Sequence, residues 1–110
     1  MSRFQLGEFE QRVLLAILRC GDSAAAADVR RELDRVLGRD VSRGAFYITL
    51  ERLEAKGLLT WDLRKRRSGG ELPERYLEVT NEGLAELRSA RRAMLEMWRG
   101  LEPLLEKGRK

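Results

Sequence analysis

The stretch VSRGAFYITLERLEAKGLLT, residues 41–60, decides how the rest of this chain is interpreted. Its apolar residues Phe46, Leu50 and Leu53 follow one another at three- and four-residue steps, so a helix formed here has one apolar face. Leu58, just past the end of that pattern, belongs to the same apolar set. We predict a helix over residues 42–56 that packs this face against a core.

Both ends of this predicted helix carry residues suited to capping. Ser42 offers a hydroxyl to the first free N–H groups, and Gly57 stands where a left-handed residue ends a helix. The face opposite the apolar one carries side chains that can reach phosphates and base edges: Arg43, Tyr47, Thr49 and Arg52. Such a face is typical of a helix that enters the major groove of DNA.

The composition restricts the class of protein. The chain has 110 residues, enough for one domain, and its 43% hydrophobic and 36% charged residues are typical of a globular protein. No apolar run approaches the roughly 18 residues of a membrane span, and the N-terminal residues lack the apolar core of a signal peptide. We therefore expect no membrane association and a cytoplasmic location.

Charge and the choice of reactive residues favour binding over catalysis. The formal net charge is +4 and the isoelectric point about 9.7, which suits a polyanionic partner. The chain has no histidine and a single cysteine, Cys20, which excludes disulfides within one chain, clustered thiolate zinc sites and the commonest general base. We expect no enzyme, no metal and no cofactor, and we expect Cys20 to be a small buried apolar residue.

Two more helices are predicted before the opening stretch. The first covers residues 7–19, and its broad apolar surface indicates burial on more than one side. The second covers residues 24–37, with Asp22 or Ser23 placed to cap it. A short connector follows, in which Val41 is a candidate for a minimal strand. Two helices, a short connector and a third helix with exposed cations form a helix-turn-helix.

A β-hairpin is predicted after the third helix. Residues 58–64 form one strand and residues 75–79 the other, with Tyr76 and either Leu77 or Val79 directed inward. A Ser-Gly-Gly turn separates them. Attached to a helix-turn-helix, such a hairpin is a wing. We assign DNA contact to the cations of this wing: Arg64, Lys65, Arg66, Arg67 and Arg75. Binding through their contacts to phosphates would weaken as the salt concentration rises. The alternative is that these cations form only a solvated strand end.

The last predicted helix begins after Thr80, which can cap it, and continues to about Leu101. Gly83 permits a close approach to a neighbour, and Pro103 either kinks the helix or stops it. This helix has more apolar surface than a three-helix core with a hairpin can cover, so we expect a symmetric homodimer; folding back on its own domain is the alternative. The residues assigned to dimerisation are Leu87, Ala90, Met94, Met97, Trp98 and Leu101.

The predicted fold class is mainly α with a small β-hairpin, a winged helix-turn-helix with a long C-terminal dimerisation helix. We divide the chain into a winged helix-turn-helix DNA-binding domain over residues 1–80, the dimerisation helix over 81–105 and a frayed tail over 106–110.

In this order, these residues resemble PadR-type transcriptional regulators. The resemblance covers the chain from about residue 6 to residue 98. Its most specific parts are two motifs, Gly44-x-Phe46-Tyr47-x-x-Leu50-x-x-Leu53-Glu54-x-x-Gly57 and Arg75-Tyr76 followed by Thr80-x-x-Gly83. Two departures stand out: the chain has Ala25-Ala26 where many members carry an aromatic-glycine pair, and Glu71 and Glu74 flank a wing segment that is commonly basic.

The resemblance implies a winged helix-turn-helix that binds double-stranded operator DNA as a homodimer, usually as a repressor. It implies a third helix in the major groove, a wing on the backbone or minor groove, and a last helix paired with its twin and with the first helix. Some members release DNA on binding a small aromatic or hydrophobic effector near the dimer interface. The corresponding place here is near Trp98, where interface packing is the alternative.

Two further alternatives concern the interface as a whole. Arg52 has acidic neighbours in Glu51, Glu54 and Asp62, so an ion pair on the helix surface competes with DNA contact. From another functional class, the winged helix could dock a protein through its third or last helix instead of binding specific DNA. The basic wing beside Arg43 favours DNA, since a protein-docking module does not need so many cations in one place.

Overall fold

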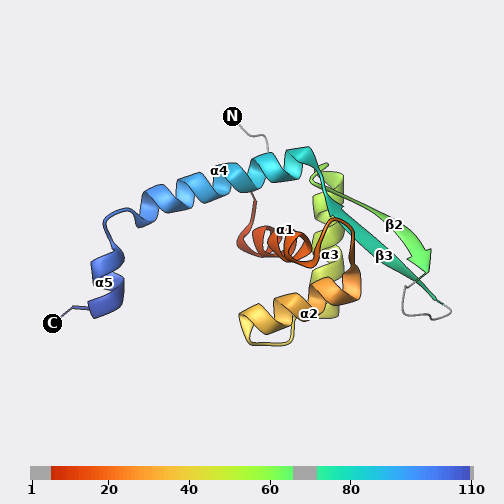
Figure 1. Cartoon of the computed structure of the whole chain (residues 1–110), viewed down its shortest axis with the longest axis horizontal. Coiled ribbons are helices and arrows are strands. Elements are labelled where there is room, and N and C mark those ends of the chain that lie inside the picture. The colour runs from red at the N-terminus through yellow and green to blue at the C-terminus, as the bar shows by residue number, and fades with distance from the viewer. Residues whose placement is uncertain (1–5, 66–71, 110) are drawn as a thin grey trace.

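The computed structural model describes residues 6–65 and 72–109. In chain order its elements are α1 (Glu8–Cys20), β1 (Ala24–Ala25), α2 (Ala26–Leu37), α3 (Arg43–Ala55), β2 (Leu59–Lys65), β3 (Pro73–Val79), α4 (Asn81–Trp98) and α5 (Glu102–Lys107). The first three helices and the sheet form a body from which α4 extends to one side and the β2–β3 hairpin to the other (Figure 1). The predicted fold class, a winged helix-turn-helix with a long last helix, is confirmed.

The core lies where α1, α2, α3 and the sheet meet. Its largest fully buried side chains are Phe46, Leu14, Ile17, Leu50, Leu53, Leu58, Leu59, Leu77, Val13 and Val29. The apolar residues predicted for α3 all belong to this set, and burying one such side chain contributes roughly 1.5–3 kcal/mol. Their burial fixes the rotation of α3 about its axis and turns its opposite face to solvent. None of the helices in the described part of the chain has the length and apolar character required to cross a membrane.

The sheet has the order β1-β3-β2, and both pairings are antiparallel. β2 and β3 form the predicted hairpin, in register from Leu59 opposite Val79 to Lys65 opposite Pro73. The prediction that residues 24 and 25 open the second helix is wrong, because they pair with β3 as the short strand β1. Helix α2 therefore starts at Ala26, and neither residue predicted as its cap performs that role.

Three predictions about single side chains are also wrong. Val41 is buried but not in a strand, because its N–H donates to Asp34 Oδ1 at 2.7 Å instead of to a neighbouring strand. Tyr76 is only half-buried. Successive side chains of β3 point to opposite faces of the sheet, and its neighbour Leu77 is the one that points into the core, where it is fully buried. Cys20, the last residue of α1, is exposed.

Four residues join the end of α3 to the start of α4, and we call this contact the α3–α4 junction: Gly57, Leu58, Thr80 and Gly83. Gly57 has φ +76°, as predicted for a residue that ends a helix. The Leu58 carbonyl accepts from the Thr80 N–H at 3.1 Å, and the Thr80 hydroxyl donates to the Gly57 carbonyl at 2.7 Å. The Thr80 oxygen also accepts from the Gly83 N–H at 3.0 Å, which confirms the predicted cap.

The last long helix is shorter than predicted. It ends at Trp98 rather than near Leu101, and Gly100 then adopts φ +80°, a conformation open to glycine without steric cost. Pro103 lies in the first turn of α5, where its missing N–H has no partner to lose. The long helix is thus interrupted at Gly100, and Pro103 lies in the first turn of a second helix instead of ending the first.

An ion pair ties α1 to the C-terminal end of α3. Lys56 Nζ lies 2.7 Å and 2.9 Å from the two carboxylate oxygens of Glu10, and the Gly7 N–H donates to the same carboxylate at 2.8 Å. Burial alone would raise the pKa of Glu10, but the hydrogen bonds from Lys56 and Gly7 outweigh it, so this pKa lies below its ordinary value of 4.5. The pair helps to hold α3 at a fixed inclination to α1.

The first prediction concerns the α3–α4 junction. A Cβ at Gly83 would lie 2.3 Å from the Leu58 carbonyl oxygen and 2.7 Å from Val79 Cγ1, so Gly83→Ala forces backbone apart. We expect a loss of about 2–3 kcal/mol in the free energy of unfolding, measured by urea denaturation. Gly44→Ala is the matched control, because a Cβ there meets nothing closer than 3.8 Å; it should be neutral or slightly stabilising. Equal stability of the two variants would contradict the packing described here.

The second prediction concerns the pH dependence of stability. Because the pKa of Glu10 is lower in the folded chain than in the unfolded one, its carboxylate stabilises the fold above pH 4.5, and this contribution disappears as the pH falls through the folded pKa. Glu10→Gln should cost about 1–2 kcal/mol at pH 7. Its urea midpoint should converge on that of the wild type at acidic pH. A difference that stays constant with pH would show that the Glu10 charge contributes nothing.

Candidate nucleic-acid interface

The exposed face of α3 is the first component of the candidate interface. Ser42 caps the helix by accepting from the Ala45 N–H at 3.2 Å, as predicted, so its own O–H remains able to donate outward. Arg43 and Arg52 are exposed and make no ion pair with any residue in the described ranges. The acidic neighbours proposed as competitors for Arg52 therefore do not pair with it in this structure.

Thr49 does not belong to that face. It is only 6% exposed, and its hydroxyl donates to the Ala45 carbonyl one turn earlier at 2.7 Å. This bond satisfies the hydroxyl internally and lets a polar residue lie at the margin of the core. The prediction that Thr49 lies among the outward-facing residues is wrong, and we leave it out of the interface.

Tyr47 is the centre of a cluster of rings and guanidinium groups. Its ring meets the buried Phe46 edge-on, with centroids 5.2 Å apart and an interplanar angle of 82°. The Arg43 guanidinium lies 5.6 Å from the Tyr47 ring centroid, and that of Arg75 lies 5.1 Å from it. Arg75 is also 4.3 Å from the ring of Trp61 on β2. Side chains of α3, β2 and β3 thus meet at the base of the wing.

The other wing cations have different surroundings. Arg64 is exposed, but its guanidinium donates to Asp62 at 3.1 Å and to the Ser23 hydroxyl at 3.0 Å, and it lies 5.0 Å from the Tyr76 ring centroid. These contacts hold Arg64 on the outer face of the sheet. Lys65, the last described residue of β2, is exposed. Arg66 and Arg67, which were also predicted to bind DNA, lie outside the described residues.

An apolar groove runs between α1 and α4. It has a volume of about 600 Å³, and its lining comprises Gln11, Leu15, Leu18, Leu84, Leu87, Arg88, Ala90, Arg91, Met94, Leu95 and Trp98. Among the residues predicted for dimerisation, Leu87 and Ala90 are half-buried there, while Met94 and Trp98 are exposed. Met97, 74% exposed, and Leu101 do not line the groove. Leu15 and Leu18 of α1 add to the apolar surface, which the sequence indicated only as a wide stripe.

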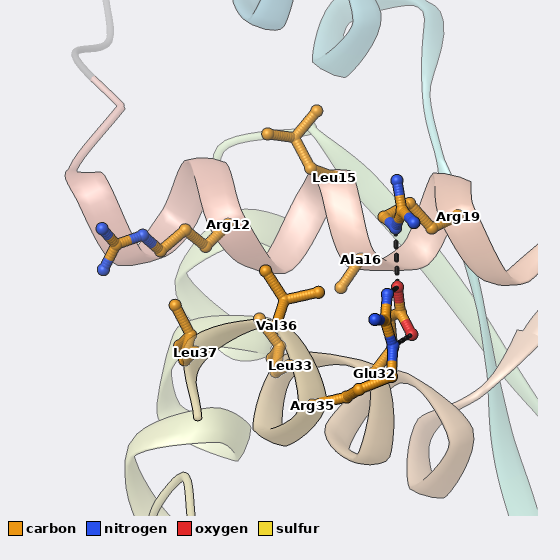
Figure 2. A pocket seen from close by; sticks show the side chains of 9 residues that line it. All are labelled: Arg12, Leu15, Ala16, Arg19, Glu32, Leu33, Arg35, Val36 and Leu37. Atoms are coloured by element: carbon orange, nitrogen blue, oxygen red, sulfur yellow. Dashed lines mark hydrogen bonds and ion pairs between the residues drawn. The ribbon is translucent and has the colours of Figure 1, made fainter. Parts of the chain in front are cut away.

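A second groove, of about 500 Å³, separates α1 from α2. Figure 2 shows Glu32 at one end, facing Arg19 and Arg35, with Leu33 and Val36 along its length. Hydrogen bonds from Arg35 and then from Arg19 lower the pKa of Glu32 to about 2. The carboxylate is therefore ionised throughout the ordinary pH range and is occupied by its own neighbours.

Metal-binding clusters are absent from the part of the chain that the structure describes. It contains no group of three or more His, Cys, Asp or Glu residues able to hold a metal ion. Desolvation of the sulfur, followed by the carboxylates of Glu32 and Asp28, raises the pKa of Cys20. The reactive thiolate is disfavoured as a result.

Trp61 is the residue of this site that sequence reasoning missed. It was assigned to a strand without any role. A signal was present, because Trp61 lies two residues after the apolar Leu59 and so shares its face of β2. What the sequence does not show is the register that brings Arg75 diagonally across from it.

Comparisons with known proteins identify the fold. No protein-family model and no curated protein matches the chain. Among solved structures, H. salinarum RosR matches with a TM-score of 0.73 and 21% identity, over 90% of this chain and 83% of that one. A PadR-like transcriptional regulator from Bacillus cereus matches with a TM-score of 0.71 and 21% identity, over 92% and 93% of the two chains. A PadR family transcriptional regulator from Eggerthella lenta matches with a TM-score of 0.64 and 26% identity, over 90% and 88%.

These matches cover most of both chains, and they include proteins of the type that the sequence motifs indicated. The predicted resemblance is thus confirmed at the level of structure: this chain has the fold of PadR-like transcriptional regulators.

Proposed function

We propose that this protein is a transcriptional regulator that binds specific operator DNA as a homodimer and acts as a repressor. The observation that carries the proposal is the exposed face of α3. Arg43 and Arg52 on that face make no ion pair with the described residues, whereas α1 and α2 contain four arginines that do: Arg12, Arg19, Arg31 and Arg35. Unpaired guanidinium groups on a helix whose other face is locked into the core are suited to guanine O6 and N7 or to phosphates.

We assign different contacts to different residues. Arg43, in the first turn of α3, is placed like the residues of a recognition helix that meet base edges. Ser42 and Tyr47 have hydroxyl groups that can donate to the flanking phosphates. Arg52, on the last turn, would contact the backbone. Within the described part of the wing, Lys65 is the cation best able to contact a phosphate, because Arg64 already donates hydrogen bonds to Asp62 and Ser23.

Dimerisation completes the proposal. The apolar groove along α1 and α4 is open to solvent, and Met94 is 52% exposed within it. Large exposed apolar patches of this kind are usually covered by a partner, and a second copy of the same surface is the economical choice. A dimer presents two copies of α3 to two half-sites. A small aromatic or hydrophobic effector would bind near Trp98, which lines this groove.

The third prediction tests whether α3 recognises a specific DNA sequence. Genomic fragments are first selected with the wild-type protein, and the affinity for a selected site is then compared with that for unrelated DNA. Arg43→Ala should weaken binding to the selected site by about tenfold or more, since a bidentate contact to guanine contributes roughly 1–3 kcal/mol of discrimination. Binding to unrelated DNA should change much less.

Arg109→Ala is the matched control for this experiment. It removes the same charge two residues after α5, a helix that lies away from α3 (Figure 1), and should leave the discrimination unchanged. An equal loss of affinity for both DNAs would show that Arg43 does not contact base edges specifically. If the wild type showed no preference for any fragment, the regulator proposal would fail in favour of a protein-docking module.

The fourth prediction tests the dimer. Met94→Glu places a carboxylate inside the proposed interface and should turn the dimer into a monomer at micromolar concentration, as measured by sedimentation equilibrium. Ser89→Glu, on the exposed side of the same helix, adds the same charge and should remain dimeric. A monomeric wild-type protein, or a Met94→Glu variant that still dimerises, would contradict the proposed interface.

A further inference from the structure

The base of the wing contains a stack of side chains that the proposed function does not account for. The Arg75 guanidinium carbon lies 4.3 Å from the ring centroid of Trp61 and 5.1 Å from that of Tyr47. Both distances are within the roughly 6 Å over which a cation is attracted to an aromatic face. The three residues belong to β3, β2 and α3 respectively, so the stack joins the wing to the helix proposed to read DNA.

Two donors in this stack have no conventional acceptor. Arg75 Nη1 and Trp61 Nε1 are both buried without a hydrogen-bond partner in the described structure. A buried donor that lacks an acceptor normally destabilises a fold. A guanidinium held against aromatic faces recovers part of that free energy through cation–π and N–H···π contacts. Arg75 is therefore committed to the two rings and not extended into solvent.

The local sequence explains why these side chains meet. Side chains alternate along β3, so Arg75 lies on the same face as the buried Leu77. Trp61 pairs with Leu77 in the register of the hairpin, which makes it the diagonal neighbour of Arg75. Tyr47 reaches the same place from α3 because its ring packs edge-on against the fully buried Phe46.

From this geometry we infer that Arg75 is a positioning residue of the proposed DNA interface, which acts through Tyr47 and Trp61 instead of binding a phosphate as an independent charge. It fixes the orientation of the Tyr47 ring and the angle between wing and α3. The Arg43 guanidinium lies against the same Tyr47 ring, 5.6 Å from its centroid, so the stack also orients the residue proposed to read bases. An interface whose parts are held in place before binding loses less conformational entropy when DNA arrives.

The inference rests on the proposed function, and a double-mutant cycle tests it. The variants are Arg75→Lys, Tyr47→Leu and the double substitution, and each is measured for affinity to the selected DNA site. Arg75→Lys retains the charge but loses the planar guanidinium. We expect each single variant to weaken binding about tenfold, and the double variant to be weakened about tenfold as well, not a hundredfold.

A second readout is independent of DNA. The chain contains two tryptophans, so Trp98→Phe leaves Trp61 as the only one. In that background, Arg75→Lys should increase the quenching of Trp61 fluorescence by acrylamide in the free protein, because the guanidinium no longer covers the ring. Arg64→Lys is the matched control: Arg64 is stacked on Tyr76 in the same hairpin, and its replacement should leave the quenching of Trp61 unchanged.

The outcomes separate the competing roles of Arg75. Additive losses in the cycle, or wild-type affinity together with an unchanged urea midpoint in Arg75→Lys, would show a phosphate-binding charge and overturn the inference. A lower urea midpoint with unchanged DNA affinity would show a purely structural role and overturn it too. If the wild type bound no specific DNA, the proposed function would fail and this inference with it, whereas specific binding with additive losses overturns the inference alone.

Discussion

The close contact at the α3–α4 junction is the constraint on which the rest of the structure depends. The Leu58 carbonyl leaves no room for a side chain at Gly83, and Thr80 is bonded to both sides of the contact. The end of α3, the start of β2, the end of β3 and the start of α4 are therefore held at one point. Since α3 is proposed to meet DNA and α4 to meet a second copy, this point fixes the direction of one surface relative to the other.

Most of the fold follows from patterns that are local in the sequence. The spacing of Phe46, Leu50 and Leu53 is sufficient to place α3 and to say which face it buries. The errors have causes that lie far along the chain. Ala24 and Ala25 form a strand because β3 provides backbone hydrogen-bond partners for them. A run of only two alanines is too short to show the alternation that would predict a strand. The end of α4 is an exception, because it depends on the backbone conformations of Arg99 and Gly100, which directly follow the helix.

The candidate site was predictable only in part, for a related reason. The sequence identifies Arg43 as an exposed cation, because helical periodicity decides exposure one residue at a time. Thr49 was misplaced because a hydroxyl that bonds to the preceding turn of its own helix can be buried. The stack of Tyr47, Trp61 and Arg75 depends on strand register and on how the hairpin lies against α3. Neither the strand register nor the position of the hairpin can be predicted from the spacing of residues in the sequence.

The sheet order described above has a consequence for the behaviour of the protein in concentrated solution. β2 lies at the edge of the sheet, and an edge strand exposes backbone N–H and C=O groups to which a strand of another molecule can add. Asp62, Arg64 and Lys65 distribute charges along that edge, and charged side chains on an edge strand oppose its pairing with another chain. The wing can therefore stay extended and exposed without becoming a template for aggregation.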